Sequence, residues 1–104
     1  MSVIKHILKE ELHRLKSLAQ DYEKKIKELP KGSLARKLRN GRAYIYLAYR
    51  DNRKVVFKYI GKESSESAKK AQIQYNQRLK YVKNLRQIER DINEIRKVIN
   101  GRGR

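Results

Sequence analysis

The chain has 104 residues, enough for one small domain, and its 28 Lys and Arg residues against 11 Asp and Glu give a net charge of +17. So large a positive charge calls for a polyanionic partner, for which nucleic acid, an anionic membrane and an acidic protein are the candidates. The chain has no cysteine, which excludes disulfides and thiolate sites, and it has no apolar run of roughly 18 residues and no apolar N-terminal block, so we expect a soluble cytoplasmic protein. Binding to a membrane surface is not expected, because the basic residues are concentrated in residues 31–62 and do not lie opposite a broad apolar helical face.

Residues 1–30 are predicted to form a long helix. Their apolar side chains recur at alternating steps of four and three, which places them in a heptad seam along one side of a helix. Pro30 disfavours helical conformation at the residue before it, and Gly32 follows, so the helix is expected to end near Leu29. The seam consists of Leu8, Leu12, Leu15, Ala19, Tyr22, Ile26 and Leu29, with Ile4 and Ile7 as an imperfect extension.

Residues 31–62 are predicted to form a three-stranded antiparallel sheet, because the apolar spacing changes to period two and β-branched and aromatic residues become frequent. Asn40-Gly41 predicts a two-residue turn with positive φ at both positions, and Asp51-Asn52 predicts a second turn less strongly. The strands are expected over residues 33–39, 42–50 and 53–60, with residue 39 opposite 42 and residue 50 opposite 53.

Residues 63–100 are predicted to form a second long helix, capped by Ser64 or Ser65 and followed by a flexible basic tail over 101–104. Its far half carries another heptad seam, so we expect the two helices to pair as an antiparallel coiled coil in a single α+β domain spanning 1–104. Pairing of this helix with that of a second copy, as a homodimer, is the alternative. The seam consists of Tyr81, Leu85, Ile88, Ile92, Ile95 and Ile99.

The excess positive charge is concentrated in the predicted sheet. Residues 31–62 hold ten basic residues and one acidic residue, whereas 1–30 hold seven and five and 63–104 hold eleven and five. More than half of the net charge therefore falls in less than a third of the chain. The helices are expected to act as a scaffold, and the sheet is expected to meet the partner.

The predicted register separates the strand residues onto two faces. One is mainly aliphatic and is expected to pack as core; it collects Leu34, Leu38, Ala43, Ile45, Leu47, Tyr49, Val56 and Ile60, with Arg36, Lys54 and Lys58 towards its margins. The other combines tyrosines with basic residues, which bind phosphates and stack on bases. In the opposite interpretation the aromatic residues form the core. The predicted nucleic-acid-binding residues are Lys37, Arg39, Arg42, Tyr44, Tyr46, Arg50, Arg53, Phe57 and Tyr59, with Val55 on the same face.

Three short motifs carry a resemblance. LPKGS at residues 29–33, YIYLAYR at 44–50 and KYIGK at 58–62 make the chain similar to small prokaryotic proteins of phages and mobile elements. More loosely, residues 32–80 resemble the arm-binding N-terminal domains of tyrosine-recombinase integrases and the plant ethylene-response-factor type of DNA-binding domain. These resemblances imply three antiparallel strands presented to the major groove with a helix behind them. The long first helix and the lack of a catalytic domain depart from the integrase pattern, so a complete recombinase is not expected.

Enzymatic and metal sites are not expected. His6, Glu10 and His13 share a helical face but lack an evident fourth ligand. The acidic residues Glu89, Asp91 and Glu94 alternate with basic residues as on a solvated helix. We therefore expect no catalysis and no cofactor. The predicted function is duplex DNA binding by a phage or mobile-element protein. The alternatives are binding to RNA or a ribonucleoprotein, and inhibition of a host nucleic-acid-binding machine through a protein partner in a nucleoprotein complex.

Overall fold

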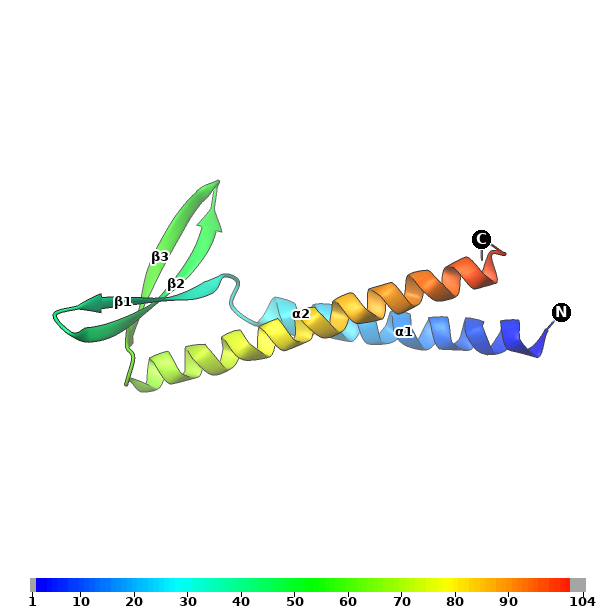
Figure 1. Cartoon of the computed structure of the whole chain (residues 1–104), viewed down its shortest axis with the longest axis horizontal. Coiled ribbons are helices and arrows are strands. Elements are labelled where there is room, and N and C mark those ends of the chain that lie inside the picture. The colour runs from blue at the N-terminus through cyan, green and yellow to red at the C-terminus, as the bar shows by residue number, and fades with distance from the viewer. Residues whose placement is uncertain (1, 102–104) are drawn as a thin grey trace. The chain divides into compact units, whose positions relative to one another are not determined.

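The computed structural model describes residues 2–101 and has the predicted order of helix, sheet and helix (Figure 1). The predicted α+β class is confirmed. Of the predicted basic tail, Gly101 lies in a turn and residues 102–104 lie outside the described residues. None of the described helices has an apolar stretch long enough to cross a bilayer. The elements are α1 (Val3–Glu28), β1 (Ser33–Arg39), β2 (Arg42–Asp51), β3 (Lys54–Lys62) and α2 (Glu66–Ile99).

The described chain divides into two compact units. The helix unit holds the residues up to Ile26 together with those from Lys80 onwards, and the sheet unit holds Lys27–Leu79. Each unit contains its own buried residues. The prediction of one domain over 1–104 stays a prediction.

In the helix unit, α1 and α2 pair in antiparallel fashion along the two predicted seams (Figure 1). Leu15 and Ala19 of α1 form a buried cluster with Ile88 and Ile92 of α2. Burial of a large aliphatic side chain stabilises a fold by roughly 1.5–3 kcal/mol, so this cluster is a main source of the unit's stability. The predicted coiled-coil pairing is confirmed. The imperfect extension is not part of the seam, since the side chains of Ile4 and Ile7 are exposed.

An aromatic contact continues the helix pairing beyond the aliphatic cluster. The rings of Tyr22 and Tyr81 lie 5.7 Å apart between centroids and are tilted by 53°. The Tyr22 hydroxyl accepts a hydrogen bond of 3.3 Å from the side-chain amide of Asn84. Residue 22 thus meets residues 81 and 84 while 15 and 19 meet 88 and 92, which is the order that antiparallel helices require.

The sheet has the order β1-β2-β3 with both pairs antiparallel. Its first turn is the predicted one: Asn40 has a φ of 51° and Gly41 a φ of 75°, and Arg39 lies opposite Arg42. Positive φ at both central residues matches the right-handed twist of the strands, and Asn and Gly tolerate this conformation best. The predicted register of the first hairpin is confirmed.

The second turn lies one residue further along the chain than predicted. Asp51 still belongs to β2 and pairs with Lys54, while Asn52 and Arg53 form the turn with φ of 49° and 69°. The predicted pairing of residues 50 and 53 is therefore wrong, and residue 50 lies opposite Val55. Moving a two-residue turn by one position changes each strand partner by two, so the paired side chains keep their predicted faces, and Arg53 leaves the strand for the turn.

Replacing Arg53 with glycine is expected to stabilise the sheet unit by about 0.5–1 kcal/mol. A left-handed conformation costs a residue with a Cβ atom about 1–2 kcal/mol, and glycine avoids most of this cost while losing more chain entropy on folding. Urea unfolding of the full chain would measure the change. A decrease in the free energy of unfolding would show that the Arg53 side chain contributes more than its backbone conformation costs.

A β-bulge alters the end of β3. Tyr46 lies opposite Tyr59, but the next residue of β2, Ile45, lies opposite Gly61, so Ile60 is the additional residue. Lys62 consequently pairs with Tyr44. Bulges turn side chains to new directions, and here the bulge brings one more basic residue to the aromatic side of the sheet.

The aliphatic face of the sheet forms the core of the sheet unit with the first part of α2. Ile45 and Ala68 are only 8% and 3% exposed. Ser65 begins the helix: its hydroxyl oxygen accepts a 3.1 Å hydrogen bond from the Ala68 backbone amide, which is the predicted N-cap. Residues from both elements line a cavity of about 140 Å³, namely Pro30, Leu34, Leu47, Lys58, Ile60, Ala71, Gln74 and Tyr75. The aliphatic side chains, and not the aromatic ones, therefore face the helix.

Candidate nucleic-acid interface

The opposite face of the sheet carries a cluster of aromatic rings that remains open to solvent. The Tyr59 ring lies 5.3 Å from that of Tyr46 and 6.3 Å from that of Tyr44, tilted by 60° and 49°. Tyr59 is 52% exposed and Phe57 is 48% exposed. Contacts between tilted rings hold the cluster together. Large aromatic side chains with half of their surface in water have area left for a ligand.

Lys37 of β1 covers one part of the cluster. Its Nζ atom lies 4.2 Å from the centroid of the Phe57 ring and 4.8 Å from that of Tyr46. Both distances allow cation-π attraction, which is worth about 0.5–1 kcal/mol at an exposed site. Lys37 of β1 thus contacts one ring of β2 and one ring of β3, and it leaves the remainder of the cluster uncovered.

A shallow hollow of about 300 Å³ lies in that uncovered part. Its walls are Arg39 of β1, Tyr44 and Tyr46 of β2, and Tyr59 of β3. These residues share a face because residue 46 lies opposite 59 and each strand alternates its side chains. The hollow therefore combines three aromatic surfaces with one guanidinium group. We use the name tyrosine hollow for these four residues.

Further basic side chains lie on the same face as the hollow. Arg39 and Arg42 lie directly opposite each other at the end of the first hairpin, Arg50 lies towards the end of β2 beside the second turn, and Lys62 lies opposite Tyr44. All four are exposed. Like charges that face each other across a strand pair destabilise it, so an anion between Arg39 and Arg42 would relieve their repulsion. Asp51 is the one acidic residue within the three strands.

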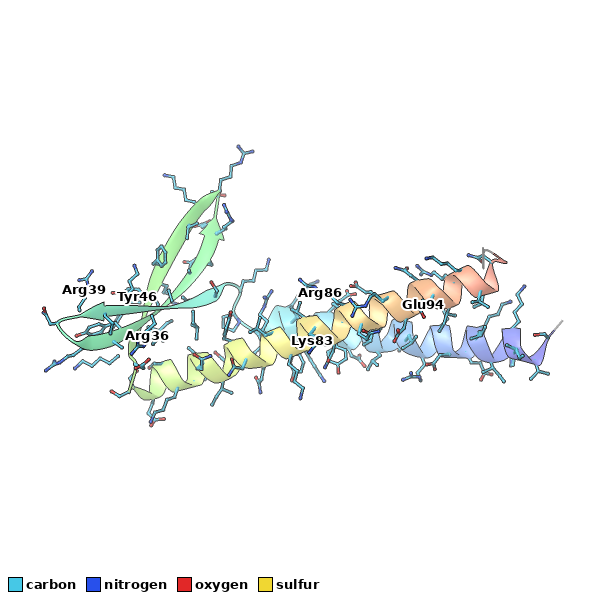
Figure 2. The ribbon with its side chains drawn as sticks, viewed as in Figure 1. Arg36, Arg39, Tyr46, Lys83, Arg86 and Glu94 are labelled. Atoms are coloured by element: carbon cyan, nitrogen blue, oxygen red, sulfur yellow. The ribbon has the colours of Figure 1, made fainter. Side chains whose placement is uncertain are left out.

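One arginine of the sheet is already engaged within the protein. Arg36 donates two hydrogen bonds, of 2.6 Å and 3.3 Å, to the Glu63 carboxylate. This bonding and the attraction of opposite charges lower the pKa of Glu63 and raise that of Arg36. Arg36 and Arg39 leave β1 on opposite sides (Figure 2). The neutralised arginine therefore belongs to the aliphatic side, while the basic residues around the tyrosines have no such partner among the described residues.

The structure brings together almost all of the predicted site residues. Arg53 is the exception, because it lies in the second turn and not on a strand. Lys62 is a member of the face that the sequence prediction missed; Gly61 within a strand was the available signal, since such glycines often mark bulges. The residues found on one face are Lys37, Arg39, Arg42, Tyr44, Tyr46, Arg50, Phe57, Tyr59 and Lys62, and we call them the aromatic-basic face.

The acidic and histidine residues form no comparable site. Within residues 2–101 there is no group of three or more His, Asp or Glu side chains placed to hold a metal ion. His6 and Glu10 are in contact at 3.0 Å on an exposed part of α1, and Asp91 accepts a hydrogen bond from Gln87 on α2. These contacts are those of surface helix pairs.

The chain matches the family described as a domain of unknown function (DUF6788) over residues 8–70, which is more than half of its length. The matched segment includes most of α1, all three strands and the beginning of α2. All residues of the aromatic-basic face lie within the matched segment. No curated protein and no solved structure matches the chain.

Proposed function

This chain belongs to the DUF6788 family, and we propose that it binds nucleic acid, with duplex DNA as the preferred form, through the aromatic-basic face. The observation that carries the proposal is the arrangement of exposed, unpaired basic side chains on the same side of a narrow sheet as a cluster of partly exposed tyrosines, of which Tyr59 is half exposed. The protein acts in this proposal as a binding protein and catalyses no reaction.

Phosphate binding accounts for the basic residues. Each Lys or Arg that neutralises a phosphate releases condensed counterions, and this release drives association. Arginine in addition binds the edge of guanine with two hydrogen bonds. Arg39 and Arg42 suit phosphate binding in particular, because the repulsion between their charges falls when a phosphate lies between them.

Duplex DNA suits the shape of the sheet. The major groove admits a two-stranded β-ribbon, and the hairpin of β1 and β2 carries basic residues at its turn and tyrosines along its length. The motifs at residues 29–33, 44–50 and 58–62 support a setting on a phage or mobile element. In that setting the protein would bind DNA in the cytoplasm of the host.

The salt dependence of binding tests this proposal. We expect the logarithm of the affinity for a short duplex to fall with the logarithm of the salt concentration with a slope of roughly −5 to −8, if about six to nine phosphates are neutralised. Fluorescence anisotropy of a labelled duplex would measure it, with single-stranded DNA and structured RNA as competitors. Stronger competition by RNA would instead favour the ribonucleoprotein alternative. Weak binding to every nucleic acid, with a protein partner retained after nuclease treatment, would contradict the proposal.

A further inference from the structure

We infer that the tyrosine hollow binds one unpaired base, so that the preferred ligand is a duplex carrying an extrahelical nucleotide. This inference rests on the proposed nucleic-acid binding and specifies its ligand. The basic residues around the hollow would hold the phosphates of the duplex, and the hollow would take the single base that lies outside the stack.

The dimensions of the hollow suit one base. Its volume of about 300 Å³ is at the lower end of the range for small-ligand sites, which fits one aromatic heterocycle better than a base pair. Its tyrosine rings are tilted by 49° and 60° to one another. Tilted rings form the walls of a recess, whereas the edge of an intact base pair in a groove presents no ring face to them.

The position of Lys37 indicates which rings remain available. The Nζ atom of this lysine lies over the Phe57 and Tyr46 rings, so the rings of the hollow that it leaves free are those of Tyr44 and Tyr59. Stacking of a base on an aromatic side chain contributes about 1–3 kcal/mol. Tyr59, with half of its surface exposed, gains most from such a contact.

Arg39 connects the hollow to the phosphate-binding residues. It forms one wall of the hollow and lies opposite Arg42 at the hairpin end. A nucleotide whose base enters the hollow would place its own phosphate close to this arginine pair. Removing a base from an intact duplex costs a few kcal/mol, and this cost is smallest where the base is already unpaired. The protein should therefore distinguish a bulged duplex from a perfect one.

The test compares a perfect duplex with the same duplex carrying one additional unpaired adenine, each made in DNA and in RNA. We expect the bulged DNA to bind about 10-fold more tightly, which corresponds to about 1.4 kcal/mol and lies within the range for one base stacked on an aromatic side chain. A fluorescent adenine analogue at the bulge should lose emission on binding. Tyr59→Leu should abolish the preference for the bulge, whereas Tyr59→Phe should retain it.

The outcomes separate the inference from the proposed function. Equal affinity for both duplexes, with the expected salt dependence, would overturn the inference alone. Absence of salt-dependent binding to any form would overturn the proposed function as well. If the bulged RNA bound more tightly than the bulged DNA, the hollow would still be the site for the unpaired base, but the preferred nucleic acid would be RNA. Circular dichroism would check that Tyr59→Leu is folded, and Tyr44→Leu provides a second variant of the same hollow.

Discussion

Replacing Arg39, Arg42 and Arg50 together with glutamine is expected to lower the affinity for duplex DNA about 100-fold. The three side chains lie on the aromatic-basic face, and all are exposed. Each lost phosphate contact should cost roughly 1 kcal/mol and reduce the steepness of the salt dependence by about 0.9, so the slope should become shallower by about three. Glutamine keeps a polar side chain, although a shorter one, and each replacement removes one positive charge. Anisotropy titrations at several salt concentrations would measure both quantities.

A matched variant separates local from overall charge. Lys83, Arg86 and Arg96 lie on α2 in the helix unit, and replacing them with glutamine removes the same net charge. Lys83 and Arg86 are labelled in Figure 2. This variant should lose less than a third of the slope that the sheet variant loses. An equal loss in the two variants would mean that DNA binding depends on overall charge and not on the aromatic-basic face.

Replacing Gly32 with alanine is expected to destabilise the sheet unit by roughly 2–5 kcal/mol. Gly32 has a φ of 111°, which side-chain-bearing residues rarely adopt, and it precedes β1 directly. A Cβ atom there would lie 2.3 Å from the backbone oxygen of Ala48 and 3.1 Å from the Cβ atom of Tyr49. Since the obstacle is backbone, a side-chain rotation cannot remove it. The loss is a large part of the roughly 5–15 kcal/mol by which small domains are stable.

Gly41→Ala is the control for the conformational part of this effect. Gly41 also has positive φ, at 75°, but an added Cβ atom would meet nothing within 4 Å. Its replacement should cost only about 1 kcal/mol, from the left-handed conformation alone. Urea unfolding of both variants gives the comparison. Similar losses at the two positions would indicate that the chain before β1 moves easily and that the close approach to β2 is not needed.

The helices and the first hairpin were predictable because local rules determine them. Leu15 and Ile88 lie in heptad seams whose spacing has only one helical interpretation, and Asn40-Gly41 has few alternatives to a two-residue turn. The second turn was placed wrongly because Arg53 adopts a positive φ that its residue type disfavours. The preference for ending β2 after Asp51 arises from strand pairing, which a local pattern does not report.

The faces of the paired strand residues were predicted correctly, with Arg53 as the exception, whereas the shape of the candidate site was not predicted. Face assignment needs only the parity of the register, and the displaced second turn preserved that parity. The hollow between Tyr44, Tyr46 and Tyr59 depends on ring tilts, and the position of Lys37 over Phe57 depends on one rotamer. The bulge that brings Lys62 to this face depends on the pairing of Gly61. These features depend on side-chain packing, which the alternation of side chains along a strand does not predict.

The order of the strands gives the basic residues a second effect. β1 and β3 each pair with β2 alone, so among the described residues both outer strands keep one row of free backbone amides and carbonyls. Exposed rows of this kind allow copies of a protein to join into extended aggregates. Lys37 and Arg39 on β1, with Lys54 and Lys58 on β3, place repelling charges along both rows. Electrostatic repulsion between copies would therefore keep this protein dispersed when no polyanion is bound.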